Sequence, residues 1–250
     1  MCFGLIAGRN TPVSRALLAG ANDDWPGCPG HTHFKPHIVH TPDEYFLAVK
    51  GHRIPQAAET YAYTYTACAY ETGTRPISWA DGMNENQVSV GMMGVYEFRN
   101  CQTEKDILEA DDITLLLLER GRTARQAIEM IGELIEEYGY TVSSIDGAAG
   151  ALCMAVADPE EGFFLELVPG GKWVAKRVAD DEVECRPNCF GTQEIDFSDT
   201  KNFICSKNLR SYALENGLWK AGEPFTITKI YGTGPVATDT DGGADGPVIR

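Results

Sequence analysis

Strand-like and helix-like patterns divide the chain into strands at both ends with helices between them. Segments rich in β-branched and aromatic residues, bounded by turn residues, are typical of strands. We predict strands at residues 2–8, 15–21, 45–49, 61–70, 77–80, 88–93, 151–157, 163–168 and 173–178. A polar turn is predicted at residues 81–86.

The middle of the sequence has helical periodicity. Residues 106–139 are predicted as two helices that divide near Arg120, with Thr123 as the N-cap of the second and Gly139 at its end. The second helix carries one apolar stripe, formed by Ala127, Ile128, Ile131, Leu134 and Ile135. A third helix is predicted from a cap at Ser206 through Glu215.

Tyr61, Tyr63 and Tyr65 alternate along one predicted strand and so share one face. Such a face can line a substrate pocket or pack against a helix layer, and the pattern leaves both open. The order of strands, two helices and further strands predicts a layered α+β fold. No shift in composition divides residues 1–231, which we predict to form one domain, whereas residues 232–250 form an acidic, glycine-rich tail.

Composition limits the classes of partner and compartment. The 250 residues carry 36 acidic and 21 basic side chains, a net charge of −15, which argues against nucleic acid and anionic membranes as partners. No apolar run is long enough to span a bilayer, and no basic segment precedes an apolar one at the start, so we expect no signal peptide. The eight cysteines are scattered without a Cys-x-x-Cys pair, which favours reduced thiols and a cytoplasmic location.

Four histidines within residues 30–40 suggest a metal site at first sight: His31, His33, His37 and His40. Zinc needs three or four convergent ligands, and no Glu or Cys stands at ligand spacing nearby. The only close cysteine pair, Cys185 and Cys189, lacks further ligands. We therefore expect no metal, and an edge strand or loop with exposed histidines.

The candidate chemistry lies at the start of the chain. Cysteine is small, so aminopeptidase removal of Met1 would leave Cys2 as the N-terminus, with a thiol and an α-amino group on one Cα. An α-amino group titrates near pH ~8 and can act as the base for the thiol without a histidine. The alternative is an ordinary cysteine in a first strand.

Two further side chains fit this chemistry. A hairpin formed by the first two strands would bring Asp24 back toward Cys2, where a carboxylate could hold the ammonium group. Asn188 follows the strand meander, and its amide could donate to an oxyanion. Both residue types are also common in simple turns.

Motifs spread over positions 1–231 resemble the cysteine dipeptidases of the PepD and secernin type, which are N-terminal-nucleophile (Ntn) hydrolases. The residues that carry the resemblance are Met1-Cys2, Asn22-Asp23-Asp24, the run Trp79 to Glu85, Leu118-Glu119-Arg120 with Thr123-Ala124-Arg125 and Ala127, Ala157-Asp158-Pro159, Leu165-Glu166, the run Trp173 to Val178, Pro187-Asn188, and Ser206 to Leu209 with Ala213, Gly217-Leu218 and Phe225.

The resemblance implies a four-layer αββα sandwich of Ntn-hydrolase type. It also implies that Cys2 is the nucleophile, with its own amine as proton shuttle, and that Asp24 lies beside it. Asn188 and the backbone N–H of Gly94 would then hold the oxyanion. Where this chain has Gly94 the relatives usually have asparagine, so only the backbone role can transfer.

Asn22, Asn84 and Arg210 are the candidate substrate-binding residues by the same resemblance. Bile-salt hydrolases and penicillin V acylases are more distant relatives with an Arg-Asn-x-Asp motif on the second strand, and here Ala21 replaces the arginine. Dipeptidases of this family are also usually considerably longer than 250 residues.

The function expected from these observations is a broad-specificity cysteine dipeptidase that needs no metal or organic cofactor. Its partner would be a small peptide or acyl-amide substrate, and we expect a homo-oligomer. Two alternatives remain: an acyl-amino-acid amidase or acyltransferase, and a truncated, non-catalytic binding or assembly subunit.

Overall fold

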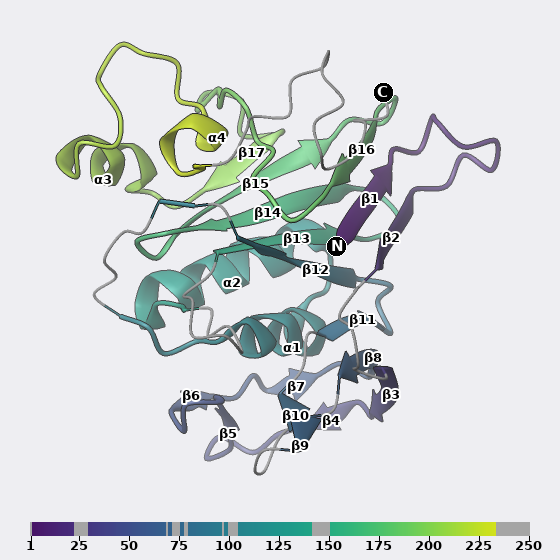
Figure 1. Cartoon of the computed structure of the whole chain (residues 1–250). Helices are drawn as coiled ribbons and strands as arrows, with labels where there is room; N and C mark the ends of the chain where they lie inside the picture. Colours follow the sequence, from purple (N-terminus) through teal and green to yellow (C-terminus); the bar gives the residue numbers. More distant parts are fainter. Residues whose placement is uncertain are drawn as a thin grey trace.

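A computed structural model describes residues 2–22, 30–68, 70–71, 76–77, 80–96, 98–99, 105–141 and 151–233 (Figure 1). Asp24 and residues 234–250 of the acidic tail lie outside the described residues. None of the described helices is both long and apolar enough to cross a membrane.

An eight-stranded antiparallel sheet is the centre of the fold, in the order β17-β15-β14-β13-β12-β11-β8-β3. The strands are β3 (Gly30–Lys35), β8 (Tyr63–Cys68), β11 (Ala80–Asn84), β12 (Ser89–Val95), β13 (Ala151–Ala157), β14 (Gly162–Val168), β15 (Lys172–Val178) and β17 (Phe203–Cys205). Every residue of β13 and β14 is buried, because both faces of the sheet are covered at its centre.

Two helices, α1 (Ala110–Arg120) and α2 (Ala124–Tyr138), cover one face of this sheet. Thr123 caps α2 by accepting a hydrogen bond from the N–H of Gln126, as predicted. The buried side chains of α2 include Ala127, Ile128, Ile131 and Ile135, which confirms most of the predicted apolar stripe.

A second sheet covers the opposite face, in the order β16-β1-β2. Its strands are β1 (Phe3–Ala7), β2 (Leu18–Asn22) and β16 (Val183–Arg186), and β1 and β2 contact β12 and β13 (Figure 1). A Cβ at Gly91 would lie only 2.4 Å from the Cβ of Ala21, so the missing side chain lets β2 approach the large sheet. The helices α3 (Leu209–Glu215) and α4 (Ile227–Ile230) contribute to the same core.

Three short two-stranded pairs complete the described secondary structure. They are β4 (Ile38–Val39) with β7 (Glu59–Thr60), β5 (Tyr45–Leu47) with β6 (Arg53–Pro55), and β9 (Tyr70–Glu71) with β10 (Pro76–Ile77). The histidine-rich β3 is the edge strand of the large sheet, as the sequence suggested.

The α+β class is confirmed, and a helix layer, a large sheet and a small sheet account for three of the four expected layers. Figure 1 shows α3 and α4 toward β15 and β17, beside the small sheet. The fourth layer stays a prediction.

Two local predictions were wrong. The polar turn expected at residues 81–86 is mostly strand β11, which the pairing with β8 fixes, and only residues 85 and 86 turn. Ser206 does not cap α3, because Asn208 holds the cap position and the Ser206 hydroxyl is hydrogen-bonded to the backbone of Trp173.

The tyrosine face packs against the helix layer. Tyr63 and Tyr65 are buried in the core formed with α1 and α2, and the hydroxyl of Tyr63 donates a hydrogen bond to Glu119 (3.3 Å). The sequence left open whether these tyrosines line a substrate pocket or pack against helices. In the structure Tyr63 and Tyr65 pack against the helices.

Gly132 lets α2 lie directly on Trp173. A Cβ added there would be 2.1 Å from a ring carbon of Trp173, which is itself buried. We predict that Gly132→Ala lowers the free energy of unfolding by about 1–2 kcal/mol, because overpacking outweighs the gain in helix propensity. Chemical denaturation of the variant measures this. Glu133→Ala, on the exposed side of the same turn, is the control and should change stability by less than about 0.5 kcal/mol. An unchanged midpoint for Gly132→Ala would contradict the close packing described here.

Candidate active site

The candidate nucleophile lies between the two sheets. Cys2 directly precedes β1, and the residue is only 8% exposed within the core cluster that also contains Val95 and Cys153. Its backbone N–H donates a hydrogen bond to Oδ1 of Asn188 (2.8 Å). This nitrogen is a peptide nitrogen while Met1 is attached, and it stands where an α-amino group would be after Met1 is removed.

Asn188 joins this nitrogen to the large sheet. Gly4 pairs with Arg186, so two residues further along in this register Asn188 lies opposite Cys2. The Nδ2 of Asn188 donates to the carbonyl oxygen of Gly94 on β12 (2.7 Å). One amide therefore contacts both Cys2 and Gly94, and the structure brings together three of the residues singled out from the sequence.

Asn22 lies next to this group. It pairs with Phe3 across β1 and β2, and its Oδ1 accepts a hydrogen bond from the N–H of Phe3 (2.9 Å). The contact fixes the end of β2 beside the residue that follows Cys2.

Asn84 has contacts that favour a structural role. The residue is 4% exposed, and its Nδ2 donates to the carbonyl oxygens of Leu118 (3.0 Å) and Gly121 (2.7 Å) at the end of α1. Its Oδ1 accepts from the N–H groups of Asn86 and Val88. Both amide donors and the oxygen are thus used by backbone groups, and substrate binding by Asn84 stays a prediction.

Arg210 lies on α3, and its guanidinium stacks over the rings of Phe197 (5.0 Å) and Trp219 (5.5 Å). These side chains line a surface hollow of about 690 Å³, together with Phe225 and Glu223. The contacts place Arg210 in this aromatic cluster and not in the group formed by Cys2, Asn188 and Gly94.

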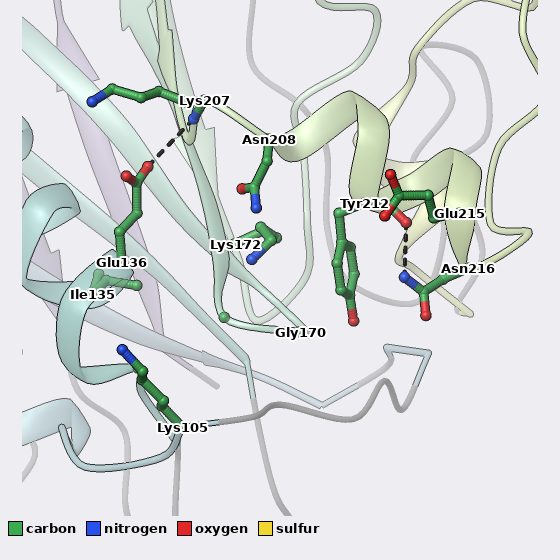
Figure 2. A pocket seen from close by; sticks show the side chains of 12 residues that line it. Lys105, Ile135, Glu136, Gly170, Lys172, Lys207, Asn208, Tyr212, Glu215 and Asn216 are labelled. Atoms are coloured by element: carbon green, nitrogen blue, oxygen red, sulfur yellow. Dashed lines mark hydrogen bonds between the residues drawn. The ribbon is translucent and has the colours of Figure 1, made fainter.

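Figure 2 shows another hollow, of about 700 Å³, between the end of α2, the β14–β15 turn and α3. Two of its lysines contact neighbouring groups: Nζ of Lys105 donates to the carbonyl oxygen of Glu137 (2.5 Å), and Nζ of Lys172 lies 4.8 Å from the ring centre of Tyr212. Lysines and glutamates both line it, so its lining favours no single charge of ligand.

Buried charges beneath the Asn188 turn were not anticipated from the sequence. Glu166 on β14 is fully buried, and its carboxylate accepts hydrogen bonds from the N–H groups of Gly191 (2.6 Å) and Thr192 (3.1 Å). Arg186 forms an ion pair with Glu184, which also pairs with Lys176 (3.0 Å). A sequence signal existed, since Glu166, Arg186 and Glu184 are ionic residues in strands, but only pairing of the sheets brings them together.

Burial and neighbouring charges set the pKa values in this cluster. Burial raises the pKa of Glu166, although Arg186 and the N–H groups of Gly191 and Thr192 oppose the shift. Burial alone would lower the pKa of Arg186, but the carboxylates of Glu184 and Glu166 outweigh it and raise that pKa. Arg186 is therefore charged, and it supplies the positive charge facing Glu166.

The described cysteines other than Cys2 include thiols that resist ionisation. Burial raises the pKa of Cys205 to about 11, with a smaller contribution from Glu136. Burial also raises the pKa of Cys153 well above its usual range, and Glu166 adds to the shift. Within the described residues, no three or more His, Cys, Asp or Glu side chains gather in a way that could hold a metal.

Comparison with known proteins gives the family. The model of peptidase family C69 matches residues 1–240, almost the whole chain. The chain belongs to peptidase family C69. This confirms the dipeptidase-type resemblance carried by the sequence motifs.

Curated relatives include a "Probable dipeptidase" of Latilactobacillus sakei, which is 24% identical over 93% of this chain and 48% of that protein. A "Probable dipeptidase B" of Lactococcus lactis is 28% identical over 87% of this chain and 45% of that protein. The chain thus spans about half the length of the curated relatives that it matches.

Solved structures with partial likeness include penicillin V acylase from Agrobacterium tumefaciens, at 14% identity and a TM-score of 0.46, covering 75% of this chain and 52% of that one. A C2A mutant of conjugated bile acid hydrolase from Clostridium perfringens matches at 13% identity and a TM-score of 0.42, covering 90% of this chain and 63% of that one.

The burial of the other thiols predicts the order in which they react with iodoacetamide. At pH 8 a thiol with a pKa of about 11 is ionised to roughly one part in a thousand, and alkylation requires the thiolate. We predict that Cys2 in protein lacking Met1 is alkylated well before Cys153 and Cys205, and that the labelling of Cys205 speeds up about tenfold per pH unit from pH 8 to 10. Peptide mapping by mass spectrometry after timed quenching measures both.

Unfolded protein in urea is the control, because burial no longer makes the thiols differ in pKa or in access to the reagent. Labelling of Cys153 or Cys205 in the native protein at the same rate as Cys2 would contradict this account of their environment.

Proposed function

We propose that the protein is a cysteine-dependent amide hydrolase acting on dipeptides, with Cys2 as its N-terminal nucleophile once Met1 has been removed. The observation that carries the proposal is the Asn188 amide, which contacts both the Cys2 nitrogen and the Gly94 carbonyl. Membership of peptidase family C69 supports the hydrolysis of peptide bonds as the reaction.

In this proposal the Cys2 thiolate attacks the carbonyl carbon of the substrate and the freed α-amino group carries the protons. It takes the proton of the thiol and gives one to the leaving amine, and then activates the water that cleaves the thioester. A position that is 8% exposed, between two sheets, supports this role because little water competes with the substrate there.

The oxyanion that forms in this attack needs donors, and Asn188 and Gly94 can supply them. An amide nitrogen carries two hydrogens, and Gly94 uses one of those on Asn188, so the other can be donated to a substrate oxygen above Cys2. In an antiparallel strand the N–H and C=O of one residue point to the same side. The Gly94 carbonyl faces Asn188, which supports a second donor from the Gly94 N–H on that side.

The remaining assignments are carried forward as proposals. Asp24 would hold the α-ammonium group of Cys2, and Asn22 would fix the strand end from which Asp24 follows. Arg210 stays a candidate for substrate binding only through the aromatic hollow around Phe197 and Trp219. The four-layer arrangement, the cytoplasmic location, a homo-oligomeric state and catalysis without a metal or organic cofactor belong to the same proposal.

We predict that Asn188→Ala lowers kcat for dipeptide hydrolysis by about 10²–10³-fold, the usual loss for one oxyanion donor. Cys2→Ala should abolish turnover, because no other group would form the covalent intermediate. Asn216→Ala is the matched control, since Asn216 is an exposed asparagine whose Nδ2 donates to a backbone carbonyl on α3 (2.9 Å). Steady-state kinetics on purified protein lacking Met1, with circular dichroism to confirm folding, measure all three. Wild-type turnover in folded Asn188→Ala would refute the oxyanion role.

A panel of dipeptides and acylated amino acids decides the substrate class. The curated relatives named as dipeptidases support dipeptides as the better substrates. A kcat/KM consistently higher for acylated amino acids would instead favour an amidase or acyltransferase.

A further inference from the structure

The segment that carries Asn188 crosses the buried face of the large sheet. Here it is called the 187–192 segment. It begins right after β16 with a tight turn in which the N–H of Cys189 donates to the carbonyl oxygen of Pro187 (2.7 Å). It ends at Thr192, whose carbonyl oxygen accepts from the N–H of Thr228 on α4 (3.3 Å). Neither contact holds the middle of the segment against the sheet.

Glu166 attaches the second half of the segment to the large sheet. Its carboxylate accepts the N–H groups of Gly191 and Thr192, three and four residues after Asn188. Glu166 and Phe164 alternate along β14 and share the face covered by the small sheet, and the guanidinium of Arg186 lies 5.2 Å from the centre of the Phe164 ring. Arg186 and Glu166 therefore both lie between the 187–192 segment and the large sheet. Arg186 ends β16, the strand that leads into the segment, and Glu166 lies on β14 of the large sheet.

A buried carboxylate is a costly way to hold a loop. It needs hydrogen bonds and a counter-charge to remain ionised at 0% exposure, and an apolar side chain would fill the same space without that cost. A carboxylate does what an apolar group cannot, because one oxygen pair fixes two consecutive N–H donors in direction as well as in distance. This geometry suits the 187–192 segment, because the side-chain amide of Asn188 must stay aligned with Cys2.

The fit around Arg186 adds a second constraint. A Cβ at Gly191 would lie 2.1 Å from Nη1 of Arg186, so the backbone of the segment rests directly on the guanidinium. Glu166 accepts the N–H groups of the segment, and Arg186 fills the space next to Gly191. The segment therefore cannot move toward the sheet without a clash, or away from it without losing hydrogen bonds.

We propose that Glu166 is a positioning residue, which aligns Asn188 with Cys2 by anchoring the 187–192 segment through the N–H groups of Gly191 and Thr192. The inference rests on the proposed function of Asn188, and it adds a residue from the large sheet to that site. Glu166 touches neither the thiol nor the substrate, and it acts only through Asn188.

The test is a double-mutant cycle of Glu166→Gln with Asn188→Ala. Glutamine has nearly the shape of glutamate, but it carries no charge and its NH₂ group cannot take the place of Oε2. The Thr192 N–H therefore loses its second acceptor (3.4 Å), and the bonds of both N–H groups to the remaining oxygen are no longer charge-assisted. A misalignment of this kind costs about 10²-fold in kcat with little change in KM. If Glu166 acts through Asn188, the double variant has the same kcat as Asn188→Ala alone. A kcat for the double variant that is lowered by the product of the two single losses would overturn the proposal.

Glu161→Gln is the matched control. Glu161 is also a partly buried carboxylate with charged partners, Arg125 (2.9 Å) and Arg177 (3.2 Å), but these contacts join α2 to β15 and do not involve the 187–192 segment. We expect this variant to lose stability while kcat stays within about twofold of wild type.

Amide hydrogen exchange on the same variants separates this proposal from the proposed function. Glu166→Gln should speed exchange at Gly191 and Thr192 at least tenfold more than in the rest of the large sheet. A wild-type protein that cleaves no dipeptide would defeat the proposed function and leave this second readout intact. Unchanged exchange in the 187–192 segment of Glu166→Gln would overturn the anchoring role whatever the activity.

Discussion

The hydrogen bonds of the Asn188 side chain are the interaction on which the candidate site depends. A single amide contacts the nitrogen of Cys2 on the small sheet and the carbonyl oxygen of Gly94 on the large sheet. Much of the remaining contact between the two sheets is apolar packing, which is not directional. A directional contact at the end of β1 is what fixes the position of a possible nucleophile relative to the strand that would share in binding an oxyanion.

The fold explains why this contact can form. The large sheet is buried on both faces at its centre, where β12 and β14 lie, and Gly91 lets the small sheet come close enough for its strand ends to meet them. Charges are also enclosed between the two sheets. Glu166, Arg186 and Glu184 are held there by one another and by backbone N–H groups, so the enclosed charges also determine where the backbone around Asn188 runs.

Sequence patterns predicted the secondary structure of the sheet centre and the helices well, because local periodicity decides them. The strands at residues 151–178 and the capped helix after Thr123 are examples. Local patterns failed where a distant partner decides the outcome. Strand β11 forms through pairing with β8 in a segment whose residues favour a turn, and Ser206 bonds to Trp173 and not to the helix that follows it.

The residues of the candidate site show the same difference between what local sequence predicts and what only distant partners decide. Cys2 and Asn188 could be singled out from the chemistry of their side chains, and the structure places them in contact. The contacts of Asn84 could not be predicted, because its amide binds the carbonyl oxygens at the end of α1, and that depends on the meeting of two elements far apart in the sequence. Glu166 was seen only as part of a motif, since nothing in its neighbours along the chain predicts the N–H groups that it accepts.

The most direct test of the central claim is to trap the covalent intermediate. Protein lacking Met1 is mixed with a dipeptide ester, quenched in acid within milliseconds to seconds, digested with pepsin at acid pH and analysed by mass spectrometry. The acid keeps the α-amino group protonated, so the acyl group cannot move to it from the thiol. The account predicts an acyl group on the N-terminal peptide, attached to the Cys2 thiol and absent when the same mixture is made with Cys2→Ala. An acyl group on another residue, or hydrolysis that continues in folded Cys2→Ala, would contradict it.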